Sequence, residues 1–281
     1  MKKIALATVA SLFLTGTAMA ADISMPMKAV APAEPAPLWD VSFGVTGTTD
    51  YVFRGISQTN GNAAIQGYAE LSFLDWFYVG AWGSNVSFLG SGSAEVDVYG
   101  GVRHTWDKLT LDVGITGYLY PGSDADTDLN YWEVYFKPSY QVTDWLNIGA
   151  QLYYTTDFAA SSTDGTYLAG TAEITLPSFG PGQVIGWSVS GEFGHQWLDS
   201  SAWNGTFLTP ITLTPYYVDV SGYNYWNIGT SLTYKAATLD LRYHGSDLND
   251  EQCVIMVANS KSCGDRFLAS LSFDVSFSDL K

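Results

Sequence analysis

The side chains that could do chemistry are charged residues placed at every second position within apolar stretches. Glu95 and Asp97 flank Val96, and Asp112 precedes Val113. Because successive side chains of a β-strand point to opposite faces, such spacing collects the charges on one face. Carboxylates and guanidinium groups gathered in this way can hold ions and polar solutes, or can pair with one another for stability alone. The residues expected on this charged face are Asp50, Arg54, Glu70, Glu95, Asp97, Arg103, Asp112, Glu133, Lys137, Glu173, Glu192, Asp240, Arg242 and Asp274.

Arg54 is the most distinctive of these cations. We expect it in the middle of a strand, between Phe53 and Gly55, with its side chain on the charged face. A planar guanidinium can take two carboxylates at once. The prediction for Arg54 is therefore a structural ion pair rather than a contact with a substrate.

A catalytic site is not expected. His244 and Ser246 are spaced as in some lipid hydrolases of the bacterial outer membrane, but Leu239, Leu241 and Tyr243 occupy the apolar face of the same stretch. The His–Ser pair would then point away from lipid, and although Asp247 directly follows Ser246, no asparagine or acid is evident that would orient the imidazole. Phosphate-loop, zinc-protease and nucleophile-elbow motifs are missing from the sequence in any fitting context. We expect no enzyme activity, no cofactor and no metal site.

The two cysteines, Cys253 and Cys263, lie close together near the C-terminus. In an exported protein such a pair indicates one disulfide that closes a short loop. A metal site would need more ligands than this segment offers.

Export is predicted by the first twenty residues. Lys2 and Lys3 precede an apolar run, and Ala18-Met19-Ala20 forms a small-residue cleavage site. Residues 21–37 are rich in alanine and proline and are expected to form an extended periplasmic leader. Residues 38–281 remain for the folded domain.

Composition narrows the class of protein further. The chain has 12 basic and 28 acidic residues and a net charge of −16, which argues against a nucleic-acid partner because phosphate contacts need cations. Only 14% of residues are charged while 15% are aromatic, a balance that suits a surface facing lipid. No apolar stretch is long enough for a spanning helix, neither in the export signal nor after it, so a membrane structure would have to be a closed β-barrel.

Period-2 alternation runs from Leu38 to Phe277 and predicts about twelve antiparallel strands. The expected strands are residues 40–57, 63–73, 76–88, 94–104, 108–119, 130–141, 145–156, 166–176, 183–196, 222–234, 237–246 and 266–277. A soluble β-sandwich would also alternate, so the connections must decide between the two folds.

The connections alternate strictly between short turns and longer polar loops, the longest spanning residues 197–222. This is the topology of bacterial outer-membrane barrels. Three of the short turns carry tryptophan beside aspartate, at Trp76, Trp106 and Trp145. Tryptophan at one end only is what an interfacial aromatic girdle requires. The sequence therefore predicts a transmembrane antiparallel β-barrel in the bacterial outer membrane.

A family resemblance points the same way. The stretch Asp50-Tyr51-Val52-Phe53-Arg54-Gly55-Ile56-Ser57-Gln58-Thr59 resembles the opening signature of the TorF family of putative porins, a proteobacterial group. Supporting matches lie at residues 81–86 and 95–100, and at Cys253, Cys263 and Arg266. The resemblance implies an outer-membrane barrel but no particular solute. Unlike most such barrels, the chain does not end on an aromatic residue, since Ser278-Asp279-Leu280-Lys281 follow Phe277.

The function expected from these features is passive diffusion of small polar solutes through a narrow pore. Ten inward carboxylates against four inward cations predict a preference for cations. The alternative is a plugged barrel in which the charges only stabilise the lumen and the outer loops bind a ligand. Expected partners are outer-membrane lipids, lipopolysaccharide, the barrel-assembly machinery and the solutes themselves.

Overall fold

The computed structural model describes residues 38–88, 92–123, 129–199, 202–208 and 215–280. The predicted export signal, residues 1–20, and the predicted leader, residues 21–37, lie outside the described residues. Within the described part of the chain, no helix is both long and apolar enough to cross a membrane.

Twelve antiparallel strands close into a barrel, in the ring order β1-β16-β15-β14-β11-β10-β9-β8-β7-β6-β5-β4. The strands of the wall are β1 (Trp39–Thr48), β4 (Ala64–Phe73), β5 (Phe77–Asn85), β6 (Ala94–Trp106), β7 (Leu109–Leu119), β8 (Tyr131–Thr143), β9 (Leu146–Thr155), β10 (Gly165–Phe179), β11 (Ile185–Leu198), β14 (Gly222–Tyr234), β15 (Ala237–Ser246) and β16 (Arg266–Ser276). Each strand pairs with its sequence neighbours in the wall, and the first and last strands close the ring from Ser42↔Ser276 to Thr48↔Ser270. The predicted barrel of about twelve strands is confirmed.

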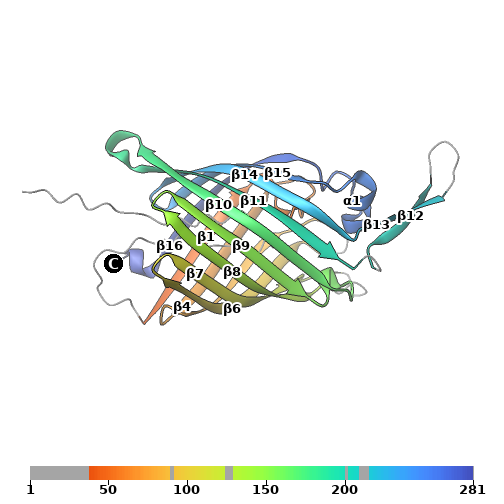
Figure 1. Ribbon diagram of the computed structural model, residues 1–281, viewed down its shortest axis with the longest axis horizontal. Coiled ribbons are helices and arrows are strands. Elements are labelled where there is room, and N and C mark those ends of the chain that lie inside the picture. Colours follow the sequence, from red (N-terminus) through yellow and green to blue (C-terminus); the bar gives the residue numbers. More distant parts are fainter. Residues whose placement is uncertain (1–37, 89–91, 124–128, 200–201, 209–214, 281) are drawn as a thin grey trace, which may run out of the picture.

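Shorter elements occupy the connections. The first outer loop holds the hairpin β2 (Val52–Phe53) and β3 (Ile56–Ser57), and the fifth holds β12 (Asn204–Leu208) and β13 (Pro215–Asp219). Helix α1 (Asp250–Val257) lies in the last outer loop. Three 3-10 turns complete the set: η1 (Phe158–Ala160), η2 (Pro181–Gln183) and η3 (Phe277–Leu280). Helix α1 and the β12–β13 hairpin lie at one end of the barrel and the C-terminus at the other (Figure 1).

Most strand boundaries agree with the sequence-based ranges to within three residues, with one clear error. The first strand was expected to run to residue 57, but it ends at Thr48. The stretch that follows turns into the barrel as a separate hairpin. The reason lies at its turn, where Arg54 and Gly55 have φ of 44° and 84°, values that an extended strand cannot contain.

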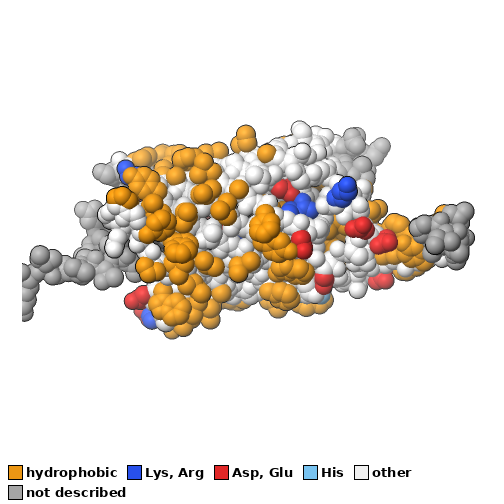
Figure 2. Space-filling model, turned by 90° about the horizontal axis from the view of Figure 1, so that it is seen from above, with side chains coloured by type: hydrophobic (Ala, Val, Ile, Leu, Met, Phe, Trp, Pro, Cys, Tyr) orange, Lys and Arg blue, Asp and Glu red, His pale blue; other side chains and the backbone are white. Residues whose placement is uncertain are grey.

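The outer face of the wall is apolar. Val113, Val134 and Phe267 expose 52%, 51% and 81% of their surface, while the charged residues beside them in the strands point inward. Figure 2 shows hydrophobic side chains covering the turn end of one face and charged side chains gathered toward the loop end. A closed barrel with an apolar outer face is the form in which a sheet crosses the bacterial outer membrane, and this protein lies there.

Tryptophans mark the membrane boundary at the turn end. Trp76, Trp106 and Trp145 are all exposed at the short turns. Trp76 stacks on His104 with ring centroids 3.9 Å apart and meets the edge of Trp106 at 5.5 Å. This is the arrangement of an interfacial girdle.

Candidate functional site

The candidate site is the lumen, the space enclosed by the twelve strands. The predicted inward residues of the wall do point into it. Eight of them are almost completely buried inside the barrel: Glu70, Glu95, Asp97, Asp112, Glu133, Glu173, Glu192 and Arg242. Arg103, Lys137, Asp240 and Asp274 are partly exposed. Strand periodicity therefore placed the charges on the correct face.

One group of charges lies on the wall formed by β4, β6, β7 and β8, toward the turn end. Arg103 donates from Nε to Oδ2 of Asp112 at 2.9 Å and from Nη1 to Oε1 of Glu70 at 3.2 Å. Lys137 adds an ion pair with Asp112 at 3.8 Å, and the hydroxyl of Tyr78 donates to the same carboxylate. This group balances two carboxylates with two cations.

A second group lies on the opposite side of the ring, on β11, β14 and β15. Arg242 is 2% exposed, and all of its partners belong to the wall. Its guanidinium donates to Asp240 at 2.9 and 3.1 Å, to Oδ1 of Asn227 at 2.7 Å and to Oγ of Ser190 at 2.9 Å. This cluster stiffens one wall but does not cross the lumen.

The first outer loop, residues 49–63, does enter the lumen. Its hairpin pairs Val52 with Ser57 and Phe53 with Ile56, leaving Arg54 and Gly55 as a two-residue turn with positive φ at both positions. This is a type I′ turn, which matches the twist of a tight hairpin. Tyr51, Val52, Arg54 and Ile56 are all 5% exposed or less, so the loop fills the barrel interior instead of covering its rim.

Arg54 fastens the tip of this loop to the far wall. Its Nη1 and Nη2 atoms donate to both carboxylate oxygens of Glu133 at 2.9 and 2.7 Å, and Nη1 also donates to Oε1 of Gln196 at 2.9 Å. The guanidinium carbon lies 4.9 Å from the ring centroid of Tyr153 and 4.4 Å from that of Tyr167. These partners lie on β8, β9, β10 and β11, whereas the loop begins and ends at β1 and β4. Arg54 thus holds a connection across the lumen; it forms the expected ion pair, from a loop and not from a strand.

The base of the loop is held by Asp50 and Arg266. Asp50 accepts hydrogen bonds from Ser57 Oγ at 2.6 Å, Thr59 Oγ1 at 2.7 Å and Arg266 Nη1 at 2.5 Å. The backbone N–H of Ser57 donates to the carbonyl of Ser262 in the last outer loop at 2.7 Å. Sequence reasoning singled out Arg266 only as a family match and missed its role as the partner of Asp50.

Tyr51, also in the first loop and outside the wall strands, donates its hydroxyl to Glu95 at 2.8 Å. Burial, together with the nearby carboxylates, raises the pKa of this phenol well above its ordinary value. Tyr51 therefore stays protonated and keeps donating at any physiological pH.

Tyrosines are the lumen residues that sequence reasoning missed. The hydroxyl of Tyr118 donates to Oε2 of Glu133 at 2.8 Å, and the hydroxyl oxygen of Tyr225 lies 3.0 Å from Nδ1 of His244. The signal was available, because Tyr131 and Tyr135 share the parity of Glu133 along β8 and must face the same side. Buried tyrosines of this kind are Tyr51, Tyr78, Tyr118, Tyr131, Tyr135, Tyr153, Tyr167, Tyr223 and Tyr225.

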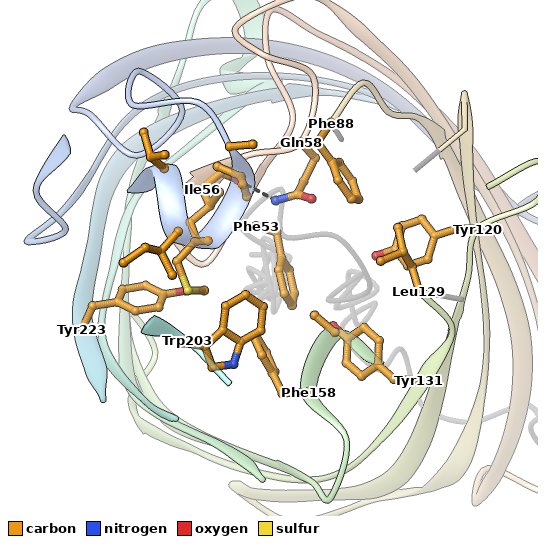
Figure 3. A pocket seen from close by; sticks show the side chains of 16 residues that line it. Phe53, Ile56, Gln58, Phe88, Tyr120, Leu129, Tyr131, Phe158, Trp203 and Tyr223 are labelled. Carbon is orange, nitrogen blue, oxygen red and sulfur yellow. Dashed lines mark hydrogen bonds between the residues drawn. The ribbon is translucent and has the colours of Figure 1, made fainter. Parts of the chain in front are cut away.

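A pocket of about 360 Å³ lies above the first loop, at the outer mouth of the barrel (Figure 3). Phe53 and Ile56 contribute to it from the first loop, while Trp203 comes from the fifth outer loop and Tyr131 from the start of β8. Figure 3 shows these side chains converging inside the ring of strands. The remaining lining residues are Gln58, Phe88, Tyr120, Leu129, Phe158, Ala159, Tyr223, Val254, Ile255, Met256, Val257 and Ala258.

The last outer loop contributes to this pocket through α1. Asn249 caps the helix, accepting from the backbone of Gln252, whose side chain accepts from the backbone N–H of Asn249. A disulfide between Cys253 and Cys263 ties the helix to the chain before β16. The predicted disulfide is present.

The His–Ser pair has no catalytic arrangement. His244 faces Tyr225, whereas the hydroxyl of Ser246 donates to the carbonyl of Cys263 at 2.9 Å. Among the described residues, no group of three or more histidine, cysteine, aspartate or glutamate side chains could hold a metal ion.

Comparisons with known proteins add a family and a general likeness. A family model described as a bacterial protein of unknown function (Gcw_chp) matches residues 32–272. A search of the curated proteins found no match.

Several solved barrels superpose loosely on the chain. The KdgM porin in complex with disordered oligogalacturonate is 10% identical, with a TM-score of 0.47 over 83% of this chain and 98% of that one. The P. putida toluene transporter TodX is 13% identical, with a TM-score of 0.48 over 87% and 91%. LpxR from Salmonella typhimurium is 9% identical, with a TM-score of 0.42 over 83% and 99%. Likenesses this distant carry no argument about what this barrel does.

Proposed function

Since the chain belongs to the Gcw_chp family of bacterial proteins of unknown function, we propose from its own geometry that it is an outer-membrane channel for small polar solutes, closed by its first outer loop. The observation that carries the proposal is the Arg54 connection. Charged side chains line the lumen, and a loop held by side-chain contacts fills it. The family resemblance to TorF porins predicts the same kind of function.

The composition of the lumen supports a path rather than a simple core. Replacing buried ion pairs by well-packed apolar residues is often neutral or stabilising. Stability alone therefore gives no reason to line the lumen with ten carboxylates. Water and ions entering a channel do give such a reason, because they need polar partners along the wall.

The mode of closure also supports a channel. The strands of the wall form a closed ring, and the lumen is blocked by a loop. This loop is covalently connected to the wall only at β1 and β4, and its other contacts with the wall are non-covalent. Breaking a few hydrogen bonds at Arg54 would free the tip without disturbing any strand pair. A loop of this kind can move on a timescale of nanoseconds to microseconds once released.

The balance of charge favours cations in the open state. The inward carboxylates are Asp50, Glu70, Glu95, Asp97, Asp112, Glu133, Glu173, Glu192, Asp240 and Asp274. Five of them, Asp50, Glu70, Asp112, Glu133 and Asp240, form ion pairs with Arg266, Arg103, Lys137, Arg54 and Arg242. Ten inward carboxylates against these five cations leave an acidic lumen, in which low-dielectric walls strengthen the field.

The test is single-channel recording in planar bilayers, with a reversal potential measured across a salt gradient. We expect discrete current steps and a cation preference. Absence of steps from both the wild type and a variant lacking the Arg54 guanidinium would refute the channel and leave a permanently plugged barrel. Surrounding lipids and lipopolysaccharide, and insertion by the barrel-assembly machinery, follow from the proposed location.

A further inference from the structure

The pocket at the outer mouth is assembled from all six outer loops. Phe53, Phe88, Phe158 and Trp203 come from the first, second, fourth and fifth loops, Leu129 from the third, and α1 forms the side contributed by the last. A disulfide and a capping box hold α1 in place. The first loop alone is enough to close the lumen. The other five loops are not needed for that, yet they also line this cavity, which suggests a binding site.

The described residues of the lining carry no formal charge. These sixteen residues include no aspartate, glutamate, lysine, arginine or histidine, in a chain whose net charge is −16. An ionised group buried among them would lose its hydration without gaining a counter-charge from these residues, which disfavours its binding. The pocket therefore selects against ions, including those that the lumen below would favour.

The walls of the pocket are aromatic and meet at angles. Phe158 lies 6.1 Å from Trp203 in a T-shaped contact and 5.8 Å from Tyr131, while Phe88 meets Tyr120 edge-on at 5.7 Å. Edge-to-face and offset contacts are the preferred arrangements of aromatic rings. Walls at several orientations suit a flat aromatic guest, which can stack on one ring and meet the edges of others.

The volume sets the size of the guest. A cavity of about 150 Å³ lined by apolar side chains holds one benzene molecule. The outer pocket, at about 360 Å³, is more than twice as large. It fits two fused rings with a small substituent.

We propose that the outer pocket binds a small neutral aromatic molecule of about two rings. This binding site is separate from the proposed channel activity. Its floor is Phe53, whose ring lies 4.6 Å from the guanidinium carbon of Arg54, so a bound guest sits directly above the closed loop.

The probe for this site is coumarin, a neutral two-ring lactone, titrated calorimetrically into the purified full-length barrel in detergent. The comparison probes are indole, which lacks an acceptor oxygen, and cinnamate, which is an anion at neutral pH. We expect saturable binding of coumarin and indole, and none of cinnamate over the same range.

Two variants locate the site. Ile255→Glu places a charge in the lining and should weaken coumarin at least tenfold. Trp203→Ala removes one aromatic wall of the pocket and should weaken coumarin and indole alike. Trp197→Phe, at an exposed tryptophan outside the pocket, is the matched control and should bind like the wild type. Heat-dependent gel mobility checks that each variant is folded.

Coumarin that fails to saturate the wild type, or that binds Ile255→Glu equally well, overturns the proposal. Because the titration involves no current, a barrel that conducts but ignores coumarin refutes this site alone, and one that binds coumarin without conducting refutes only the channel.

Discussion

Replacing Arg54 by methionine tests how the lumen is closed. Methionine keeps much of the length and the contact with the surrounding rings but removes the guanidinium. When the loop is docked, Glu133 is 1% exposed and, among the described residues, would retain only the hydroxyl of Tyr118 as a hydrogen-bond donor. When the loop is released, water can reach the carboxylate. The substitution therefore acts on the docking equilibrium itself.

The magnitude follows from the burial of the pair. Removing one partner of a buried ion pair costs about 3–5 kcal/mol because the other charge stays desolvated. Since each 1.4 kcal/mol is a factor of ten, docking should weaken by a factor of roughly one hundred to a few thousand. In planar bilayers, Arg54→Met should be open for a much larger fraction of the recording than the wild type.

The matched control is Arg242→Met. Arg242 is as deeply buried as Arg54 and carries the same charge, but all its partners lie in the wall. This variant should change selectivity without raising the open fraction. A double variant, Arg54→Met with Glu133→Gln, should open less than the two single effects added together, because the uncompensated charge is gone. Equal open fractions in Arg54→Met and Arg242→Met, or no change in Arg54→Met, would refute the assignment of Arg54 as the fastening of the loop.

Three further results are expected. Cys253→Ser should leave a folded, heat-modifiable barrel while lowering the stability of the last outer loop by about 2–3 kcal/mol, seen as faster proteolysis of that loop; loss of the barrel band would contradict this. Glu95→Gln combined with Asp97→Asn should bring the reversal potential closer to zero, and the cation preference of the wild type should shrink as the Debye length falls to about 3 Å at 1 M salt; a shift toward stronger cation preference would show that these side chains do not face the path. Val113→Arg, on the lipid face, should cost about 2–4 kcal/mol in urea unfolding, against about 0–1 for Trp106→Arg near the interface; equal costs would place the membrane elsewhere on the wall.

The strands of the wall were predictable because apolar residues on the lipid face alternate in the sequence with polar residues on the lumen face. Val113 and Val134 face lipid and Asp112 and Glu133 face the lumen, so period-2 alternation identifies each strand and each side. The turns add their own mark through aspartate and tryptophan. The alternation and the turn residues depend only on neighbours in the sequence, and they recur in each pair of consecutive strands.

The closed loop was not predictable by the same reasoning. Val52, Phe53 and Ile56 read as the continuation of a strand, because alternation does not distinguish a wall strand from a short hairpin. What separates them is the contact between Arg54 and Glu133, two residues 79 positions apart. The outer pocket was missed for the same reason, since it exists only when six loops meet. Gly55 was the one local sign, because glycine readily takes the positive φ that the second position of a type I′ turn requires.

The pairing of β1 with β16 has a consequence for the order of events in assembly. The ring is sealed by contacts such as Ser42↔Ser276, between residues at opposite ends of the chain. Every other wall strand can pair with a strand that precedes it in the sequence. The pairing of β1 with β16 can form only after the last strand has been synthesised and has reached the membrane. Until then the chain has two open sheet edges, each a template for pairing with other molecules. A chain cut short before Arg266 therefore cannot seal itself, and aggregation or degradation of such fragments is the expected fate. The first strand and the last therefore decide together whether there is a lumen at all.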